Sequence, residues 1–550
     1  MLRLSELKLP LDHPASALRD AALAMLGIAP GDLLDLSVAR RGYDARRRSA
    51  INLVYAVDVT LRDEAEILSR LQANPRIRPA PDTRYIFPIQ VTAPTMRPVV
   101  IGTGPCGLMA ALTLAQMGLR PLILERGKLV RERTKDTWGL WRRGVLDPES
   151  NVQFGEGGAG TFSDGKLYSG IKDPRHLSRR LLTEFVEAGA PDEILFVSKP
   201  HIGTFRLVTV VENIRTKIEA LGGEYRFNAR VDDIVLDETR HVRGLILADG
   251  EQIEAGHVVL AIGHSARDTF RMLHRHGVHI EAKPFSIGVR VEHPQALIDK
   301  ARFGGFAGHP LLGPADYKLV HHASNGRSVY SFCMCPGGRV VAATSEPGCV
   351  ATNGMSQYSR AEFNANAGIV VGITPEVDYP GDPLAGIAFQ QQWERAAYLA
   401  GGSTYAAPAQ RVGDLLAGRA STALGEVVPS YQPGVHPADL AACLPGFAIE
   451  AIREALGKFA RDIPGFAMHD ALLTGVETRT SSPIRITRGA DGVSLNTPGL
   501  YPAGEGAGYA GGIMSAGVDG IRVAEAVASS LTGSPLVERM TRGDGSVTYG

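Results

Sequence analysis

Residues 97–112 read Arg-Pro-Val-Val-Ile-Gly-Thr-Gly-Pro-Cys-Gly-Leu-Met-Ala-Ala-Leu, and this stretch indicates the class of fold. A short apolar strand runs into a Gly-x-Gly-x-x-Gly turn and then into a helix. Gly102 permits the tight turn, Gly104 lets backbone amides approach a pyrophosphate, and Gly107 lets the helix pack closely on the strand. Pro105 suits the first helical turn, where its missing N–H is no loss. Free N–H groups at that helix N-terminus favour phosphates, so the stretch predicts a dinucleotide site.

The next segment supplies the acid that such a site needs. Residues 120–127 predict a second strand ending at Glu125, eighteen positions after Gly107 and close to the ~20 expected for a carboxylate that binds a ribose. A strand–helix–strand unit that binds nothing is the alternative, and the complete order of strand, turn, helix and acid argues against it. No second complete glycine fingerprint follows, so a separate nicotinamide domain is not expected.

A second glycine-rich segment follows some four hundred residues later, at 499–517. It predicts a strand, an acidic turn at Glu505, a glycine loop, and a helix that begins with small residues. A remote second contact suits FAD rather than NAD, because the flavin end of FAD extends well beyond the pyrophosphate. The two segments together resemble the two FAD-binding motifs of glutathione-reductase-type flavoproteins. The resemblance places Glu505 near the ribityl chain and pyrophosphate. It places the amides of 511–513 at the flavin N1–C2=O edge, where a helix N-terminus stabilises negative charge.

Three further segments fit the same resemblance. The glycine-dense loop at 151–167 would pass over the flavin ring, the strand at 229–236 would touch the adenine, and the strand at 257–265 would return beside the cofactor. Residues 248–250 predict a hairpin turn before that last strand. The predicted FAD contacts are Gly102, Gly104, Pro105, Cys106, Gly107, Glu125, Arg126, Gly158, Gly160, Thr161, Val231, Gly263, Gly504, Glu505, Gly511, Gly512 and Ile513.

Several phrases suggest a narrower family. They are FGEGGAGTFSDGKL at 154–167, KPHIGT at 199–204, YSFCMCPGG at 330–338, NGMS at 353–356 and VETRTSSP at 476–483. Through them the chain resembles, nearly end to end, the bacterial FAD-dependent dehydrogenases of unassigned substrate. The resemblance implies an α/β fold in which a glutathione-reductase-type, Rossmann-like FAD-binding domain is split by an inserted α/β substrate domain. A small N-terminal α/β module precedes both.

The expected boundaries follow from this arrangement. We expect an N-terminal module at 1–92, the first part of the FAD domain at 96–280, the substrate domain at 281–469, the second part of the FAD domain at 470–533 and a tail at 534–550. Within the first module, 51–59 predict a strand, and 18–26 and 63–72 predict helices. Within the substrate domain, we expect helices at 359–371 and 449–460.

Lys166, Cys335 and Arg479 are the candidate catalytic residues. Lys166 is the long cation of the glycine loop and could stabilise reduced flavin or an anionic substrate; a surface ion pair is the alternative. Cys333 and Cys335 would share one face of a strand. A thiol or dithiol that exchanges electrons with flavin or attacks a substrate is one interpretation, and two small packed side chains is the other. The Cys-x-x-x-x-Cys spacing usual in disulfide reductases is absent, which counts against a dithiol reductase. Arg479 could bind a carboxylate or phosphate, or could pair with an acid such as Glu477. His264 is a weaker candidate for a proton donor.

Composition excludes several classes of protein. The chain has 550 residues, with 58 Lys and Arg balanced by 58 Asp and Glu, so no chain-wide basic field for nucleic acid exists. No apolar run approaches the ~18 residues of a membrane span. The five cysteines form neither a disulfide framework nor a metal-binding spacing. We therefore expect a cytoplasmic protein without a metal site and with no membrane partner. The charge balance also argues against nucleic acid, although a local basic patch is not excluded.

The predicted function is that of a cytoplasmic FAD-dependent oxidoreductase, which moves a hydride between flavin N5 and a small organic substrate. NADH, NADPH or a protein electron donor could serve it, or the substrate itself could supply the hydride. The basic stretch at 40–48 keeps an RNA-associated flavoprotein open, although a solvated hairpin also explains it. A non-enzymatic flavin-binding protein is the third possibility.

Overall fold

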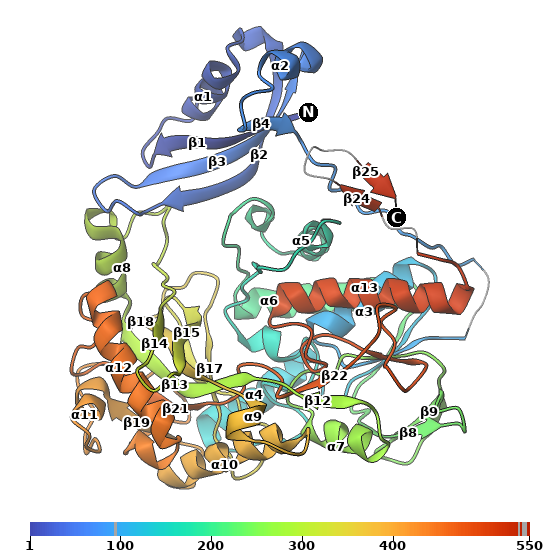
Figure 1. Cartoon of the computed structure of the whole chain (residues 1–550), viewed down its shortest axis with the longest axis vertical. Helices are drawn as coiled ribbons and strands as arrows, with labels where there is room; N and C mark the ends of the chain where they lie inside the picture. Colours follow the sequence, from blue (N-terminus) through green and yellow to red (C-terminus); the bar gives the residue numbers. More distant parts are fainter. Residues whose placement is uncertain (93–95, 537–538, 542–546, 550) are drawn as a thin grey trace.

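The N-terminal module is a four-stranded antiparallel sheet with two helices on its outer face, drawn in blue in Figure 1. The computed structural model describes residues 1–92, 96–536, 539–541 and 547–549. The module consists of β1 (Leu2–Pro10), α1 (Ala17–Leu26), β2 (Leu33–Asp44), β3 (Asn52–Leu61), α2 (Glu64–Arg70) and β4 (Ile77–Pro79). The strands lie in the order β2-β3-β1-β4, and every second residue of β3 is buried. The strand and helices expected here are confirmed.

A parallel five-stranded sheet carries both glycine-rich segments. Its strands lie in the order β23 (Leu500–Pro502), β11 (Val258–Leu260), β5 (Val99–Ile101), β6 (Leu122–Leu124) and β7 (Glu224–Arg226). Each neighbouring pair is parallel. All five strands therefore end at the same edge of the sheet, where ligands bind in open α/β folds. The turns after β5 and β23 meet at this edge although about 400 residues separate them in the sequence.

Helices α3 (Pro105–Gln116) and α13 (Ile513–Thr532) follow these two turns and pack against each other (Figure 1). A Cβ added to Gly520 would lie 2.1 Å from the carbonyl oxygen of Cys106. Only glycine allows this approach, so the small residues of α13 set how closely the two helices pack.

The other elements of this half surround the parallel sheet. They are α4 (Val130–Arg143), α5 (Leu177–Glu187), α6 (Thr204–Ala220), α7 (Arg267–Arg275), the antiparallel strands β8 (Val231–Leu236), β9 (Val242–Leu247) and β10 (Gln252–Glu254), and the pair β12 (Ile280–Ala282) and β22 (Ile484–Ile486). The hairpin turn expected at 248–250 joins β9 to β10.

A mixed seven-stranded sheet forms the second half. Its order is β14 (Val320–His322), β15 (Ser328–Cys335), β18 (Asn364–Ile373), β13 (Phe285–Pro294), β21 (Leu472–Glu477), β19 (Ala407–Arg411) and β20 (Val435–Pro437). The hairpin of β16 (Arg339–Ala342) and β17 (Thr352–Met355) lies beside it. Its helices are α8 (Gln295–Phe303), α9 (Pro375–Asp378), α10 (Ala385–Ala400), α11 (Val412–Leu416) and α12 (Gly446–Asp462). Strand β21 belongs to this sheet, although its residues follow position 469, where we expected the substrate domain to end.

The helix expected at 359–371 is wrong, because most of this segment is strand β18. β18 pairs with β13 on one side and β15 on the other, and nine of its ten residues are buried. A strand buried on both faces shows an apolar run instead of alternation, and such a run cannot be told from a buried helix by its period. The second expected helix, at 449–460, is confirmed within α12.

The N-terminal module contacts the rest of the chain through strand β2. Arg41 on β2 exchanges backbone hydrogen bonds with Phe196 and Ser198, and the ring of Tyr43 meets that of Phe303 edge to face. The connecting segment then runs along the body, where Tyr85 donates to Glu525 on α13. Within the described ranges, every helix is too short or too polar to serve as a membrane span.

Candidate functional site

A cavity of about 360 Å³ lies where the edge of the parallel sheet faces the seven-stranded sheet. Its wall combines the turn after β5, the loop at 153–169, the turn after β11, and residues of β15, β17 and β21. Pockets for cofactors and small ligands commonly measure about 300–1,000 Å³. Both halves of the molecule therefore contribute to one ligand-sized space.

Two helix N-termini open into this cavity. Gly104 precedes α3 and Gly512 precedes α13, and neither helix start has a side-chain cap. The first N–H groups of a helix have no partner within the helix, and they attract anions. Gly512 has a φ of 123°, a conformation that suits glycine. An elongated anion such as a dinucleotide pyrophosphate fits between these helix ends.

The first glycine motif is tightly packed on one side and open on the other. A Cβ on Gly107 would lie 1.9 Å from the oxygen of Gly102, so this glycine is required by helix–strand packing and does not line the cavity. A Cβ on Gly104 would meet nothing closer than 3.8 Å. The space beside Gly104 is therefore available to a ligand, as the motif predicts.

Glu125 lines the cavity, but its carboxylate is already engaged by the protein. One oxygen accepts hydrogen bonds from the N–H and hydroxyl of Thr103, at 3.0 and 2.5 Å. The other accepts from the N–H groups of Gly127 and Gly155, at 2.9 and 3.0 Å. A carboxylate offers about four acceptor sites. In this structure Glu125 therefore ties the ends of β5 and β6 to the glycine loop.

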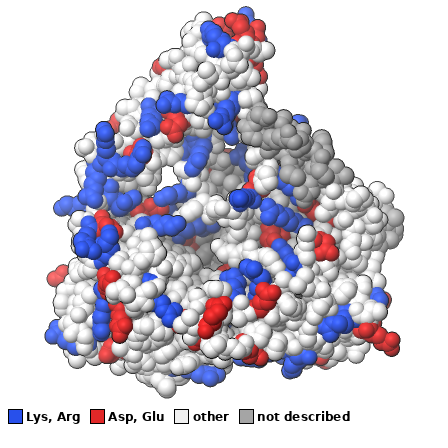
Figure 2. Space-filling view, in the orientation of Figure 1, with Lys and Arg blue, Asp and Glu red and all other residues white. Residues whose placement is uncertain are grey.

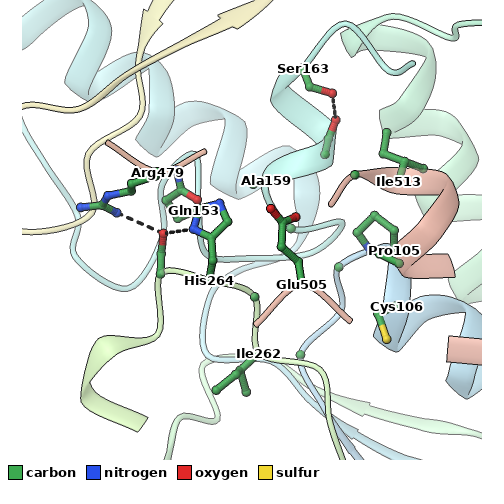
Figure 3. A pocket seen from close by; sticks show the side chains of 18 of the residues that line it. Pro105, Cys106, Gln153, Ala159, Ser163, Ile262, His264, Arg479, Glu505 and Ile513 are labelled. Atoms are coloured by element: carbon green, nitrogen blue, oxygen red, sulfur yellow. Dashed lines mark hydrogen bonds between the residues drawn. The ribbon is translucent and has the colours of Figure 1, made fainter. Parts of the chain in front are cut away.

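Glu505 points into the cavity between His264 and the start of α13 (Figure 3). Burial raises the pKa of its carboxyl group from 4.5 to about 7, and the charge on Cys333 raises it further. Lys283 and the Gly512 amide act in the opposite direction. Glu505 can therefore hold or release a proton near neutral pH, within reach of a ligand.

A hydrogen-bonded chain links His264 to the second half of the molecule (Figure 3). The His264 Nδ1 lies 3.0 Å from the Ser265 hydroxyl, which accepts from Arg479 at 3.1 Å. Burial, together with the positive charges of Arg479 and Arg267, lowers the pKa of His264 to about 3. The imidazole is therefore neutral at physiological pH.

Arg479 lines the cavity but is paired within the protein. Its guanidinium makes two hydrogen bonds to Glu394, at 3.0 and 2.9 Å. Glu394 is fully buried on α10 and also binds Arg267. The two arginines hold the pKa of Glu394 well below its usual range against the opposing effect of burial. Of the two interpretations of Arg479, the structure contains the ion pair, with Glu394 rather than Glu477 as its partner.

Glu477 instead pairs with Arg290, in a contact that the sequence did not indicate. The Arg290 guanidinium is fully buried and binds both oxygens of Glu477, at 2.5 and 3.0 Å. It also donates to the carbonyl of Cys333 at 2.9 Å. The pair lies on the adjacent strands β13 and β21, so it fixes the wall of the cavity from behind.

Lys166 and the two cysteines lie at the end of the cavity formed by the seven-stranded sheet. The Lys166 ammonium donates to the carbonyl of Met334 and lies 3.8 Å from Asp164. Cys333 lines the cavity, whereas Cys335 is fully buried behind it. The strand is irregular between Phe332 and Cys335, and Cys333 has a φ of 42°. Both cysteines lie in strand β15, as expected, but the expectation that they share one face is wrong, because a bulge interrupts the pairing between them.

Most of the residues expected from sequence meet in this one cavity. Those that line it are Gly102, Gly104, Pro105, Cys106, Glu125, Arg126, Gly158, Gly160, Lys166, Val231, Gly263, Arg479, Glu505, Gly511, Gly512 and Ile513. Those that do not are Gly107, Thr161, Cys335 and Gly504. A Cβ on Gly504 would lie 2.7 Å from that of Cys106, so Gly504, like Gly107, serves packing. Among the cavity residues absent from the expected set are Gln153, Tyr168, Thr352 and Asn353.

Comparison with known proteins indicates an FAD-dependent family, which agrees with a cofactor site in the cavity. A family model described as "FAD-dependent protein, C-terminal domain-like" matches residues 284–480, and a domain of unknown function matches residues 1–60. A protein of Clostridium beijerinckii, named only as an uncharacterized protein, is 46% identical over 528 residues, which cover 95% of this chain and 98% of that protein. The chain belongs to the same family as this clostridial protein.

Solved structures give more distant likenesses. Glycerol-3-phosphate dehydrogenase from Bacillus halodurans, complexed with FAD, is 14% identical with a TM-score of 0.36, over 80% of this chain and 66% of that one. L-proline dehydrogenase from P. horikoshii is 14% identical with a TM-score of 0.34, over 81% of this chain and 96% of that one. Both TM-scores are below 0.5, so neither likeness bears on what this chain does.

FAD is the cofactor of this chain. The matched family is that of an FAD-dependent protein, and the uncapped helix N-termini and the open space at Gly104 suit its pyrophosphate.

Proposed function

We propose that this protein is an FAD-dependent oxidoreductase that transfers a hydride between flavin N5 and a small organic molecule. The observation that carries the proposal is the shared cavity, in which the two glycine segments and side chains of the seven-stranded sheet line one space. Bound FAD would supply the two-electron chemistry. The protein would bind and orient the reactants, exclude water and control protons.

The glutathione-reductase-type arrangement belongs to this proposal. It is supported by the parallel order β23-β11-β5-β6-β7, which brings Gly104 and Gly512 to one edge of one sheet. Under this proposal the α3 N-terminus binds the pyrophosphate, and the amides at 511–513 bind the flavin. Val231 also lines the cavity and would contact the adenine.

The side chains near the proposed flavin position can manage protons without carrying charge at rest. Glu505, with a pKa raised to about 7, can hold a proton at neutral pH. His264, with a pKa lowered to about 3, stays neutral and can donate or accept a hydrogen bond. An acid and an imidazole poised in this way are suited to a substrate that gains or loses a proton with its hydride.

The test is an anaerobic absorbance spectrum of the purified yellow protein during a screen of metabolites with NADH and NADPH. At least one compound should bleach the flavin band faster than it bleaches free FAD. A flavin that no compound and no cell extract reduces would support the non-enzymatic alternative instead. A colourless protein that refuses FAD on titration would remove the proposal altogether.

An RNA-associated flavoprotein remains a second candidate, because one surface is strongly basic. Figure 2 shows Lys and Arg side chains gathered around the hollow between the N-terminal module and the body. Among the described residues, Arg40, Arg47 and Arg48 are exposed, and their side chains make no hydrogen bond or ion pair. Such unpaired cations suit a phosphate backbone.

A further inference from the structure

We propose that Cys333 and Cys335 form a reversible dithiol–disulfide couple in the cavity wall, and that this couple exchanges two electrons between bound FAD and a small disulfide compound. The inference rests on the proposed oxidoreductase function and deepens it, because it names a carrier within the chain and a class of substrate. It is carried by the bulge in β15, by two cations that hold this bulge, and by an unpartnered hydroxyl in the same cavity.

The bulge places the two sulfurs on a shortened stretch of strand. Phe332 pairs with Gly368 and Cys335 with Asn366, so three residue steps on β15 span two steps on β18. At about 3.4 Å per residue, two regular steps cover roughly 6.8 Å, so the two bulged steps from Cys333 to Cys335 advance only roughly 4.5 Å along the strand. Disulfides join Cα atoms about 4.4–6.8 Å apart, so a bond between these cysteines is geometrically accessible.

The side chain of Cys335 already turns toward Cys333. Its Sγ lies 3.4 Å from the carbonyl oxygen of Cys333. The left-handed conformation of Cys333, with a φ of 42°, costs energy in a residue other than glycine. Such a conformation persists only where the surrounding contacts hold it, and it is common at functional sites.

Two cations donate hydrogen bonds to successive carbonyls of this turn. Arg290 donates to the carbonyl of Cys333 at 2.9 Å, and Lys166 donates to the carbonyl of the next residue, Met334. Both cations are anchored, Arg290 by the fully buried pair with Glu477 and Lys166 beside buried Asp164. Positive charge close to a thiol stabilises the thiolate, which is the reactive form.

The two thiols are consequently unequal. A side-chain hydrogen bond between the two thiols holds the pKa of the Cys333 thiol well below its usual range, with help from Lys166 and Arg290. The same hydrogen bond and burial raise the pKa of Cys335. The cavity-lining sulfur is thus the attacking thiolate, and the buried one is the resolving thiol. The thiols of Cys106, Cys349 and Cys443 have pKa values raised by burial.

A separate observation indicates that a ligand binds in the cavity that Cys333 lines. Thr352 lines the same cavity and is only 4% exposed, yet its hydroxyl has no hydrogen-bond partner among the described residues. A buried polar group without a partner is costly, so a ligand that supplies the partner is favoured. Asn353 follows it in β17 and also faces the cavity.

The chemistry balances in two steps. The Cys333 thiolate attacks one sulfur of a small disulfide R–S–S–R, forms a mixed disulfide and releases one R–S⁻. Cys335 then loses its proton to solvent and attacks the sulfur of Cys333, which releases the second R–S⁻ and leaves the internal disulfide. This internal disulfide would regain both thiols by accepting two electrons and two protons, which bound FAD in its reduced form would supply. A hydride donor such as a reduced nicotinamide reduces the flavin again.

The first test counts thiols and does not depend on turnover. The holoprotein, treated with excess small disulfide, is denatured with an alkylating reagent, and its mass is measured before and after chemical reduction. Of the five cysteines, three should be alkylated in the oxidised protein and all five after reduction. Peptide mapping should place the missing pair at Cys333 and Cys335. Five alkylated thiols under every condition would overturn the proposal.

The second test counts electrons. Anaerobic dithionite titration of the oxidised holoprotein should consume four electrons per chain before the flavin is fully bleached, two for FAD and two for the disulfide. Cys333→Ser and Cys335→Ser should each consume two. Cys443→Ser is the matched control and should still consume four. The Cys443 thiol contacts the Leu440 carbonyl at 3.5 Å, and a serine hydroxyl can retain that contact.

These readouts separate the two proposals. If the protein holds no FAD but forms the internal disulfide, the oxidoreductase function fails while the dithiol assignment stands. If the flavin bleaches with two electrons in the wild-type chain and all five thiols stay free, the dithiol fails while the oxidoreductase function stands. The wild-type measurements decide both points even if a serine variant does not fold.

Discussion

Individual side chains in the cavity have properties that the surrounding protein imposes on them. Glu505 and His264 are ordinary residues whose pKa values burial moves in opposite directions, upward for the acid and downward for the base. In both cases the neutral form is favoured. Lys166 and Arg290 then supply positive charge where the Cys333 thiolate needs it. Each of these effects can be measured one residue at a time.

The raised pKa of Glu505 predicts that the apoprotein becomes less stable as the pH rises. Between pH 4.5 and about 7 the folded protein binds more protons at this site than the unfolded chain, so the free energy of unfolding falls as pH rises through that window. Glu505→Gln should remove about 1–3 kcal/mol of this fall, measured by urea unfolding at several pH values. The exposed Glu254→Gln is the control. An unchanged pH profile for Glu505→Gln would contradict the prediction.

Removal of the charge at Lys166 should make Cys333 less reactive at neutral pH. Other charged or titratable groups around the thiol are Cys335, Arg290, Asp164, Glu477 and Glu505. Lys166→Met keeps most of the volume but removes a charge that lowers the thiol pKa. We expect the pH midpoint for iodoacetamide alkylation of Cys333 to rise by about one unit, which is about a tenfold loss of rate below the midpoint.

The measurement for Lys166 is the mass-resolved alkylation rate of the peptide that contains Cys333. Lys458→Met, which removes a cation from α12 far along the chain, should leave the midpoint in place. A midpoint that stays fixed in Lys166→Met would show that the ammonium only positions the Met334 carbonyl.

At the scale of elements, the glycines of the two turn–helix segments serve two different purposes. Gly107 and Gly520 allow α3 to approach β5 and α13, whereas Gly104 and Gly512 leave space at the cavity. The same residue type therefore serves packing at one position and ligand access at another. This distinction separates the effects of substitution on folding from those on cofactor binding.

Alanine at Gly104 and at Gly107 should give opposite results. At Gly104 the added methyl group meets no protein atom within 3.8 Å, so stability should hold while FAD affinity falls at least about tenfold because the pyrophosphate is crowded. At Gly107 it would lie 1.9 Å from the Gly102 oxygen, so the apoprotein should lose about 1–3 kcal/mol. Urea unfolding and flavin fluorescence titration measure the two effects, and equal losses in both variants would contradict the assignment.

Features set by neighbouring residues could be predicted from the sequence, and those set by distant partners could not. The turn at 102–107 obeys steric rules within a few residues, and its residues 102–106 line the cavity. Glu394 binds residues 85 and 127 positions away, so nothing near it in the sequence identifies it as an ion-pair partner. The bulge at Cys333 was missed because cysteine has no preference for the left-handed conformation. Strand β18 was mistaken for a helix because it is buried on both faces.

At the scale of the whole molecule, balanced net charge conceals an uneven distribution. Lys and Arg equal Asp and Glu in number, yet the hollow beside the N-terminal module is bordered by cations (Figure 2). The open face of the module's sheet lies toward the body, while α1 and α2 cover the outer face (Figure 1). An anionic partner would therefore meet the module and the body together.

Neutralising the basic hairpin tests this partner. If RNA binds here, replacing Arg40, Arg47 and Arg48 by Gln should weaken binding of a single-stranded oligonucleotide. The slope of the logarithm of the affinity against the logarithm of the salt concentration should become shallower by about 0.7 per lost phosphate contact. Fluorescence anisotropy at several salt concentrations measures both. A control with equal charge change carries Gln at Arg275, Arg395 and Arg461. No binding at low salt, or equal losses in both variants, would exclude the RNA candidate.

The cavity wall has a thermodynamic consequence because two separate sheets share it. A ligand that contacts both sheets stabilises only those states in which both are folded and docked. The cofactor should therefore couple the unfolding of the two halves. Without it the two halves can unfold as separate cooperative units, and with it they should unfold together in one sharper calorimetric transition.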